Sequence, residues 1–291
     1  MTQFLRAQRE RGRLRLPVAL LGTLVLALAS APSALANSTQ SSNWAGYAVH
    51  RSSVRFKHVF GAWTQPTAQC VPGTPTYSSV WVGLGGYNET SNALEQIGSE
   101  VDCSARGKVL SSVWYELVPA PSRTIRMTVN PGDRLTASVD VNGHQVKLEL
   151  DDLTRHKTFT HSVRASVVDV SSADWIVEAP SECTGGSSCQ TLALANFGSA
   201  KFMRARATAT TGKPGSISSH SWDLTRITLA PSGRHFIGNP GSAPATALPS
   251  GLSSGGTTFT VTYRSAPNPT PSSSLRNTRR AAGLLVRPRR S

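Results

Sequence analysis

Three polar side chains interrupt runs in which apolar residues alternate as in a β-strand: Gln96, Glu116 and Glu178. A glutamate whose pKa lies near the working pH can serve as a general base or acid. A carboxamide can donate hydrogen bonds to a developing oxyanion, and two glutamates can form the carboxylate pair of a glycosidase. Composition alone, however, places each of the three on the solvent-facing side of a half-exposed sheet, with no catalytic role.

Familiar catalytic motifs are absent from the sequence, which has no HExxH, no P-loop, no GxGxxG after a strand and no CxxC. A single GxSxG match, at 251–255, lies in Gly/Ser-rich sequence. It lacks the strand and the helix that a nucleophile elbow requires. His156 and His161 are too far apart on a strand to bind one metal together. Serine, cysteine and metal mechanisms therefore have no support.

Five short motifs, in the same order and spacing, resemble those of the eqolisins, or glutamic peptidases. They are Asn43-Trp44-Ala45-Gly46-Tyr47, Trp81-Val82-Gly83-Leu84-Gly85-Gly86, Leu94-Glu95-Gln96-Ile97-Gly98, Trp114-Tyr115-Glu116-Leu117-Val118-Pro119 and Asp174-Trp175-Ile176-Val177-Glu178. The likeness runs from about Trp44 to Tyr263. Each motif is weak alone, but five collinear motifs over nearly this whole stretch form a specific signal.

The resemblance implies an all-β fold, an antiparallel β-sandwich of two sheets (jelly-roll or lectin-like) with one face forming a substrate groove. It also implies that Gln96 and Glu178 are the catalytic pair, and that Trp44, Trp114 and Glu116 bind substrate. Glu178 then acts as general base and later as general acid. Gln96 positions the water and stabilises the oxyanion. This mechanism needs no metal, no cofactor and no covalent intermediate.

Two positions depart from the family pattern. The glycine-rich loop at 83–86 lacks the acidic residue that the family often has there, and Ser99-Glu100 stands where an aspartate is common. These differences affect the expected hydrogen-bond network rather than the pair itself. Known fungal members are strongly acidic proteins, whereas this domain is slightly basic, so an acidic pH optimum is a weaker expectation here.

The sequence independently predicts strands almost throughout, because apolar residues recur with period two and hardly with period 3.6. Turn signals at 130–133 and at Asn142-Gly143 separate alternating runs. Many short strands without helices predict an antiparallel sandwich or barrel. The expected strands are 43–49, 54–63, 79–84, 94–101, 111–118, 124–129, 134–141, 145–152, 157–163, 174–178, 192–195, 201–210, 217–230 and 257–263.

Four cysteines, Cys70, Cys103, Cys183 and Cys189, form an even set, which favours disulfides in an exported chain. Three connectivities are possible. The flexible loop between Cys183 and Cys189 can close on itself, which leaves Cys70 to pair with Cys103. A zinc site is the competing interpretation, but the spacings are not CxxC-like and no histidine pair stands near them.

Residues 1–36 have the grammar of a cleaved secretory signal: five arginines, an apolar run from Leu16 to Leu28, and a small-residue exit at Ala34-Leu35-Ala36. The apolar run is shorter than the roughly 20 residues that span a bilayer. We therefore expect a secreted, extracellular protein with no stable membrane anchor. Residues 37–264 form the expected peptidase domain, and 265–291 form a Pro/Ser-rich, then basic, disordered tail.

The net charge of +14 is concentrated at the two ends of the chain. The leader contributes +4 and the stretch from Arg264 contributes +7, so residues 37–263 carry only +3. Nucleic acid is thus not expected as a partner. Protein or peptide substrates are, and the domain is expected to be a monomer.

These observations favour a secreted endopeptidase. The main alternative is a non-catalytic sandwich that binds carbohydrate or peptide through exposed tryptophans. The joint presence of Gln96 and Glu178 favours the enzyme, because a binding module has no reason to keep that pair. A glycosidase using Glu116 and Glu178 is the third hypothesis.

Overall fold

The computed structural model describes residues 37–265, except 89, 185–187 and 238–244. The expected signal peptide and nearly all of the expected tail lie outside the described residues, as do the side chains of 183–189. The described residues belong to one compact unit within Ala36–Ser291. No helix in this part of the chain is long and apolar enough to cross a membrane.

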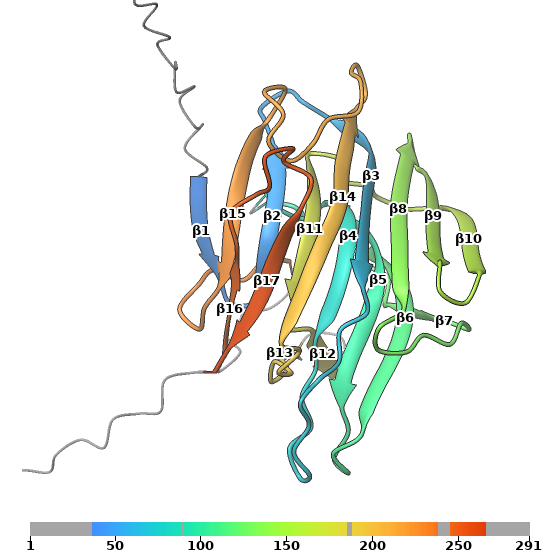
Figure 1. Cartoon of the computed structure of the whole chain (residues 1–291). Coiled ribbons are helices and arrows are strands. Elements are labelled where there is room, and N and C mark those ends of the chain that lie inside the picture. The colour runs from blue at the N-terminus through green and yellow to red at the C-terminus, as the bar shows by residue number, and fades with distance from the viewer. Residues whose placement is uncertain (1–36, 89, 185–187, 238–244, 266–291) are drawn as a thin grey trace, which may run out of the picture. The chain divides into compact units, whose positions relative to one another are not determined.

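One fifteen-stranded sheet folds over on itself to give two layers (Figure 1). The first layer contains, in order across the sheet, β10 (Lys157–Arg164), β9 (Gln145–Asp152), β8 (Arg134–Asn142), β3 (Phe56–Thr64), β14 (Ser199–Ala209), β17 (Phe259–Arg264) and β16 (Thr246–Pro249). The second contains β15 (Asp223–Leu229), β2 (Trp44–His50), β11 (Ser172–Glu178), β4 (Ser79–Gly85), β5 (Leu94–Cys103), β6 (Val109–Val118) and β7 (Arg123–Ile125).

All pairings within and between these layers are antiparallel, and β16 joins the layers by pairing with β15. A further strand, β1 (Asn37–Ser41), runs parallel to β15. β12 (Ser181–Thr184) and β13 (Ser188–Thr191) form a separate hairpin. The expected all-β sandwich is therefore confirmed, with its two sheets continuous in hydrogen bonding.

The main core lies between the layers, where β3 and β8 pack against β4, β5 and β11. Trp63 and Trp175 are fully buried there, and Trp175 Nε1 donates to Phe60 O at 2.8 Å. The second layer also carries an apolar cluster on its outer face, which points away from the first layer. Its members are Trp44, Ala48, Trp81, Leu94, Trp114, Ile176, Ile227 and Phe236. The central strands of the second layer are thus apolar on both faces.

Both predicted turns are present. Asp133 N donates to Asn130 O at 3.0 Å, and Gly132 has a φ of +91°, which favours glycine. In the hairpin between β8 and β9, Asn142 pairs with Gln145. The two-residue turn is therefore formed by Gly143 and His144, one position later than the Asn-Gly signal suggests.

Three expected strands differ from the structure. β7 ends at Ile125, no strand covers 192–195 apart from a bridge at Leu194, and β15 begins only at Asp223. The segment 216–222 turns instead, with Ser219 N donating to Ser216 O. Ser221 N also donates to Ser219 Oγ at 3.3 Å, and such local side-chain bonds of serine compete with a strand ladder. The sequence also gave no signal for β1, β12, β13 and β16, which are all short.

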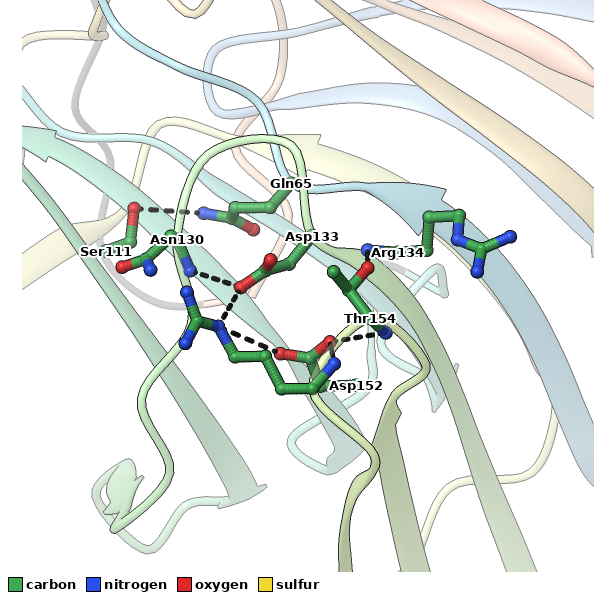
Figure 2. Close-up of polar contacts among 8 residues, drawn as sticks. Gln65, Ser111, Asn130, Asp133, Arg134, Asp152 and Thr154 are labelled. Carbon is green, nitrogen blue, oxygen red and sulfur yellow. Dashed lines mark hydrogen bonds and ion pairs between the residues drawn. The ribbon is translucent and has the colours of Figure 1, made fainter.

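A buried carboxylate ties the turn at 130–133 to the connection between β9 and β10 (Figure 2). Asp133 accepts bonds from Arg155 Nε and from Asn130 N, both at 2.7 Å. Burial alone would raise the pKa of Asp133, but these hydrogen bonds hold it below its usual value. Asp152 adds an ion pair to Arg155 at 3.8 Å and caps the turn through Thr154 N.

The Cys70–Cys103 disulfide is present and closes a loop with a sequence separation of 33. It links the segment after β3 to the end of β5, the strand that carries Gln96. The backbone places Cys183 directly opposite Cys189 in the β12–β13 hairpin. The expected bond between their side chains lies outside what is described.

Candidate active site

Gln96 and Glu116 stand directly opposite each other on β5 and β6. Gln96 Nε2 donates to Glu116 Oε2 at 2.7 Å, and the Gln96 side chain is only 4% exposed. An ionised carboxylate only accepts hydrogen bonds. The contact therefore fixes which end of the amide faces Glu116. No described donor reaches Gln96 Oε1.

Glu178 is the last residue of β11 and is paired across the ladder with Ser79 and Trp44. On the same strand, Asp174 lies opposite Gly83, which in turn lies opposite Gln96. Paired residues share one face of a sheet, and so do residues two positions apart. Gln96, Glu116 and Glu178 therefore all lie on the outer face of the second layer, here called the dyad face.

One indole N–H and one side-chain amide N–H donate hydrogen bonds to the Glu178 carboxylate. Trp81 Nε1 donates to Oε2 at 2.8 Å, and Asn43 Nδ2 approaches Oε1 at 3.3 Å. Gly98 lies opposite Trp81, and a Cβ there would come within 2.5 Å of Trp81 Cβ. A glycine at 98 therefore allows Trp81 to occupy this place beside Glu178.

Asn43 is itself fixed by the segment that follows β15. Its Nδ2 donates to Phe236 O at 2.9 Å, and its Oδ1 accepts from Phe236 N at 3.0 Å and Ser41 Oγ at 2.9 Å. The ring of Phe236 stacks on Trp44, with centroids 4.7 Å apart and planes 3° apart. Backbone and ring contacts from Phe236 thus position Asn43 and Trp44 beside Glu178.

The pKa of Glu178 is raised to about 8, chiefly by burial and also by the negative charge of Glu116. Hydrogen bonds from Trp81, Trp44 and Asn43 lower the pKa but do not cancel the effect of burial. Burial also raises the pKa of Glu116, against the bond from Gln96. Glu178 is thus a carboxyl group that can hold or release a proton near neutral pH, as an acid–base catalyst requires.

Trp44 and Trp114, the expected substrate-binding tryptophans, are buried, with exposures of 1% and 6%. Trp44 meets Trp81 edge-on at 5.0 Å and is covered by Phe236. No described partner bonds Trp114 Nε1. Both rings belong to the buried apolar cluster of the dyad face. A sugar-binding module needs exposed tryptophans, so their burial weighs against that alternative.

Sequence reasoning missed Asn43, Trp81 and Phe236 as neighbours of Glu178. The first two lie in the family-like motifs, so the motifs could have suggested them. Their contact with Glu178 depends on strand register, which one sequence does not reveal. Phe236 lies in a loop that carries no motif.

An acidic residue from elsewhere in the chain, Asp169, contacts the glycine-rich loop. Asp169 Oδ2 accepts from Gly86 N at 3.0 Å and from Ser91 Oγ at 2.5 Å. Gly85 has a φ of +85°, and a Cβ on it would lie 2.4 Å from Asp169 O. The close approach of Asp169 therefore requires glycine at 85. At the second divergent site, Ser99 Oγ accepts from Trp63 Nε1 at 2.9 Å.

Comparison with known proteins decides the family. The sequence profile described as the Peptidase A4 family matches residues 42–231. The chain belongs to the peptidase A4 family. These are the eqolisins, or glutamic-type endopeptidases, so the resemblance in the five motifs is confirmed. A search of curated protein sequences gives no significant match.

Two solved structures of eqolisins share the fold of this A4 peptidase. Scytalido-glutamic peptidase with a transition state analogue inhibitor is 22% identical, with a TM-score of 0.60. SCP-B, an eqolisin in complex with the tripeptide Ala-Ile-His, is also 22% identical, with a TM-score of 0.55. Each alignment covers 77% of this chain and 98% of the other. Within the described part of the A4 peptidase, no three His, Cys, Asp or Glu side chains are grouped as a metal site.

Buried carboxyl groups predict that the peptidase is more stable in acid than in mild alkali. Burial raises the pKa of Glu95 to about 9 and, with the Glu100 charge, that of Asp102 to about 7. Their unfolded values are near 4, so the folded state holds protons that the unfolded state releases. The stabilisation from these two protonated groups is therefore fully present below about pH 4. It falls as pH rises toward each folded pKa, and the free energy of unfolding decreases by up to about 1.4 kcal/mol per pH unit for each group.

Glu95→Gln is expected to flatten this dependence, because glutamine mimics the protonated side chain. Urea unfolding from pH 4 to 9 measures it: the variant should match wild type at pH 4 and exceed it at pH 8. Glu182→Gln, an exposed position, should leave the curve unchanged. Parallel curves for Glu95→Gln and wild type would refute a proton-holding Glu95.

Proposed function

We propose that this A4 peptidase is a secreted endopeptidase that hydrolyses peptide bonds with Glu178 and Gln96 as its catalytic pair. The observation that carries the proposal is the carboxyl of Glu178, with its pKa raised to about 8, on the same sheet face as the Gln96 amide. The expected signal sequence at 1–36 supports export. N-terminal sequencing of the exported protein tests it: Asn37 should be the first residue, and an intact leader would contradict it.

In the first step, ionised Glu178 removes a proton from water while the water oxygen bonds to the substrate carbonyl carbon. The carbonyl oxygen gains the negative charge. One N–H of Gln96 Nε2 is bonded to Glu116, and the other is available to the water and then to the oxyanion. A preorganised donor of this kind is worth about 2.7–4 kcal/mol.

In the second step, Glu178 returns the proton to the amide nitrogen, the C–N bond breaks, and the carboxyl product forms. Glu178 ends ionised, as it began. Trp81 and Asn43 keep its two oxygens in place through the cycle. Glu116 is a positioning residue, since it acts by holding the Gln96 amide.

Removal of either member of the pair should abolish most proteolysis. Gln96→Ala should lower kcat by about 10²–10³-fold, and Glu178→Gln by at least about 10²–10⁴-fold, because it removes the acid–base group. The assay follows cleavage of a denatured protein, with circular dichroism to verify folding. Gln145→Ala and Glu182→Gln, at exposed positions, are matched controls. Full activity in either dyad variant would refute the assignment.

Substitutions of Glu116 and Trp81 should shift the acid limb of the pH profile of kcat/KM in opposite directions. Activity rises as Glu178 ionises, so the limb reports its pKa. Glu116→Gln removes a repelling charge and should move the limb to lower pH. Trp81→Phe removes a hydrogen bond to the ionised form and should move it to higher pH. Shifts in the same direction would contradict this role for Glu178.

A further inference from the structure

A groove of about 1090 Å³ lies where the two ends of the folded sheet approach each other. Its walls come from β7 and the residues that follow it, and from the β9–β10 turn and β10, the terminal strands of the sheet order. Both strands lie on the same side of the molecule (Figure 1). Tyr115, which lines the groove, directly precedes Glu116 on β6. Adjacent residues of a strand face opposite ways, so the groove lies away from the dyad face.

The floor of this groove is apolar and aromatic. Tyr115, Met127 and Phe159 are partly buried and pack against the main core. Tyr115 and Phe159 stack with centroids 5.9 Å apart, and His161 lies 5.3 Å from Tyr115. Such rings offer a large contact area to apolar side chains.

The rim is basic. Arg123, Arg126 and Lys157 are exposed, and in the described part of the chain none of them forms an ion pair. Arg155 also lines the groove but is engaged by Asp133. Among the described residues that line the groove, none is acidic. An anionic ligand would therefore meet three uncompensated cations and no repelling carboxylate.

The wall formed by β10 is an open strand edge. β10 pairs with β9 over eight residues, and no other described strand pairs with it. Its inward residues Phe159, His161 and Val163 are only half-buried, alternating with exposed ones. An unpaired edge with alternate side-chain sites is the structure that accepts an added strand.

We propose that this groove binds an extended acidic peptide segment, which pairs with the free edge of β10. Its apolar side chains rest on Tyr115 and Phe159, and its carboxylates face Arg123, Arg126 and Lys157. The chain's own C-terminal stretch does not suit the groove, because it carries seven arginines and no acid from Arg264 onward. Resting on the proposed function, one consequence is that acidic segments of protein substrates are held here, away from Gln96 and Glu178.

A direct binding measurement tests the site without catalysis. The probe is a fluorescein-labelled decapeptide that alternates glutamate with phenylalanine or valine. Its anisotropy is titrated with the full exported chain carrying Glu178→Gln, which prevents cleavage. The double variant Arg123→Glu/Arg126→Glu should weaken binding by at least about tenfold. Lys108→Glu/Lys213→Glu makes the same charge change at exposed positions elsewhere and should bind as tightly as the parent.

Two further probes test strand pairing. One is N-methylated at the odd-numbered residues of the decapeptide and the other at the even-numbered residues. Since β10 offers one edge, one phase should lose binding and the other should keep it. Absence of saturable binding, equal loss in both double variants, or indifference to both methylation phases would overturn the proposal. A sulfated oligosaccharide that binds equally well, together with indifference to N-methylation, would assign the groove to anionic polysaccharide.

The outcome is separable from that of the proposed function. In the wild-type background, Arg123→Glu/Arg126→Glu should leave cleavage of a short neutral peptide unchanged and raise KM only for substrates with an acidic segment. Peptide binding together with a wild-type protein that cleaves no substrate would support the groove and refute the proposed peptidase; cleavage by wild type without peptide binding would refute the groove alone.

Discussion

Burial of one carboxyl group at the end of a doubly covered strand is the constraint on which the candidate site depends. β11 lies between β2 and β4, and its residues before Glu178 are buried on both faces. Trp175 and Val177 face the main core, while Ile176 belongs to the outer cluster. A carboxylate at the end of such a strand loses water, and desolvation disfavours its charged form. The resulting proton affinity makes Glu178 suited to acid–base chemistry.

That burial is tolerable only because distant segments supply hydrogen-bond donors. Trp81 comes from a strand 97 positions earlier in the chain, and Asn43 is 135 positions away. Asn43 is locked in turn by Phe236. An ionised buried group without such partners would be strongly destabilising. The site is therefore a product of the whole second layer rather than of one motif.

The period-two pattern was sufficient to predict the sandwich and its turns, because alternation and turn chemistry are local properties. It failed at 217–222, where serine-rich sequence forms local bonds instead of a ladder. It also placed Gln96, Glu116 and Glu178 on a solvent-facing side, whereas Gln96 is buried and Glu116 and Glu178 are only partly exposed. The cause is physical: β4 and β11 are apolar on both faces, so alternation no longer separates inside from outside.

Family resemblance supplied the pairing of Gln96 with Glu178, but not the contacts that tune it. Trp81 and Asn43 reach Glu178 through the registers of β4 and β2 against β11. Register follows from packing across the whole sheet. The motifs thus identify the strands that matter, and only the folded structure shows which side chains meet.

The candidate site and the groove of this peptidase depend on different kinds of electrostatics. Around Glu178, proton affinity is raised by burial, so rising pH ionises Glu178 and also charges Glu95 and Asp102 inside the fold. Rising pH therefore favours ionisation of Glu178 but weakens the native state. The groove between β7 and β10 has a different basis. Its rim carries the exposed basic side chains of Arg123, Arg126 and Lys157. Recognition of an acidic segment there would weaken as the salt concentration rises.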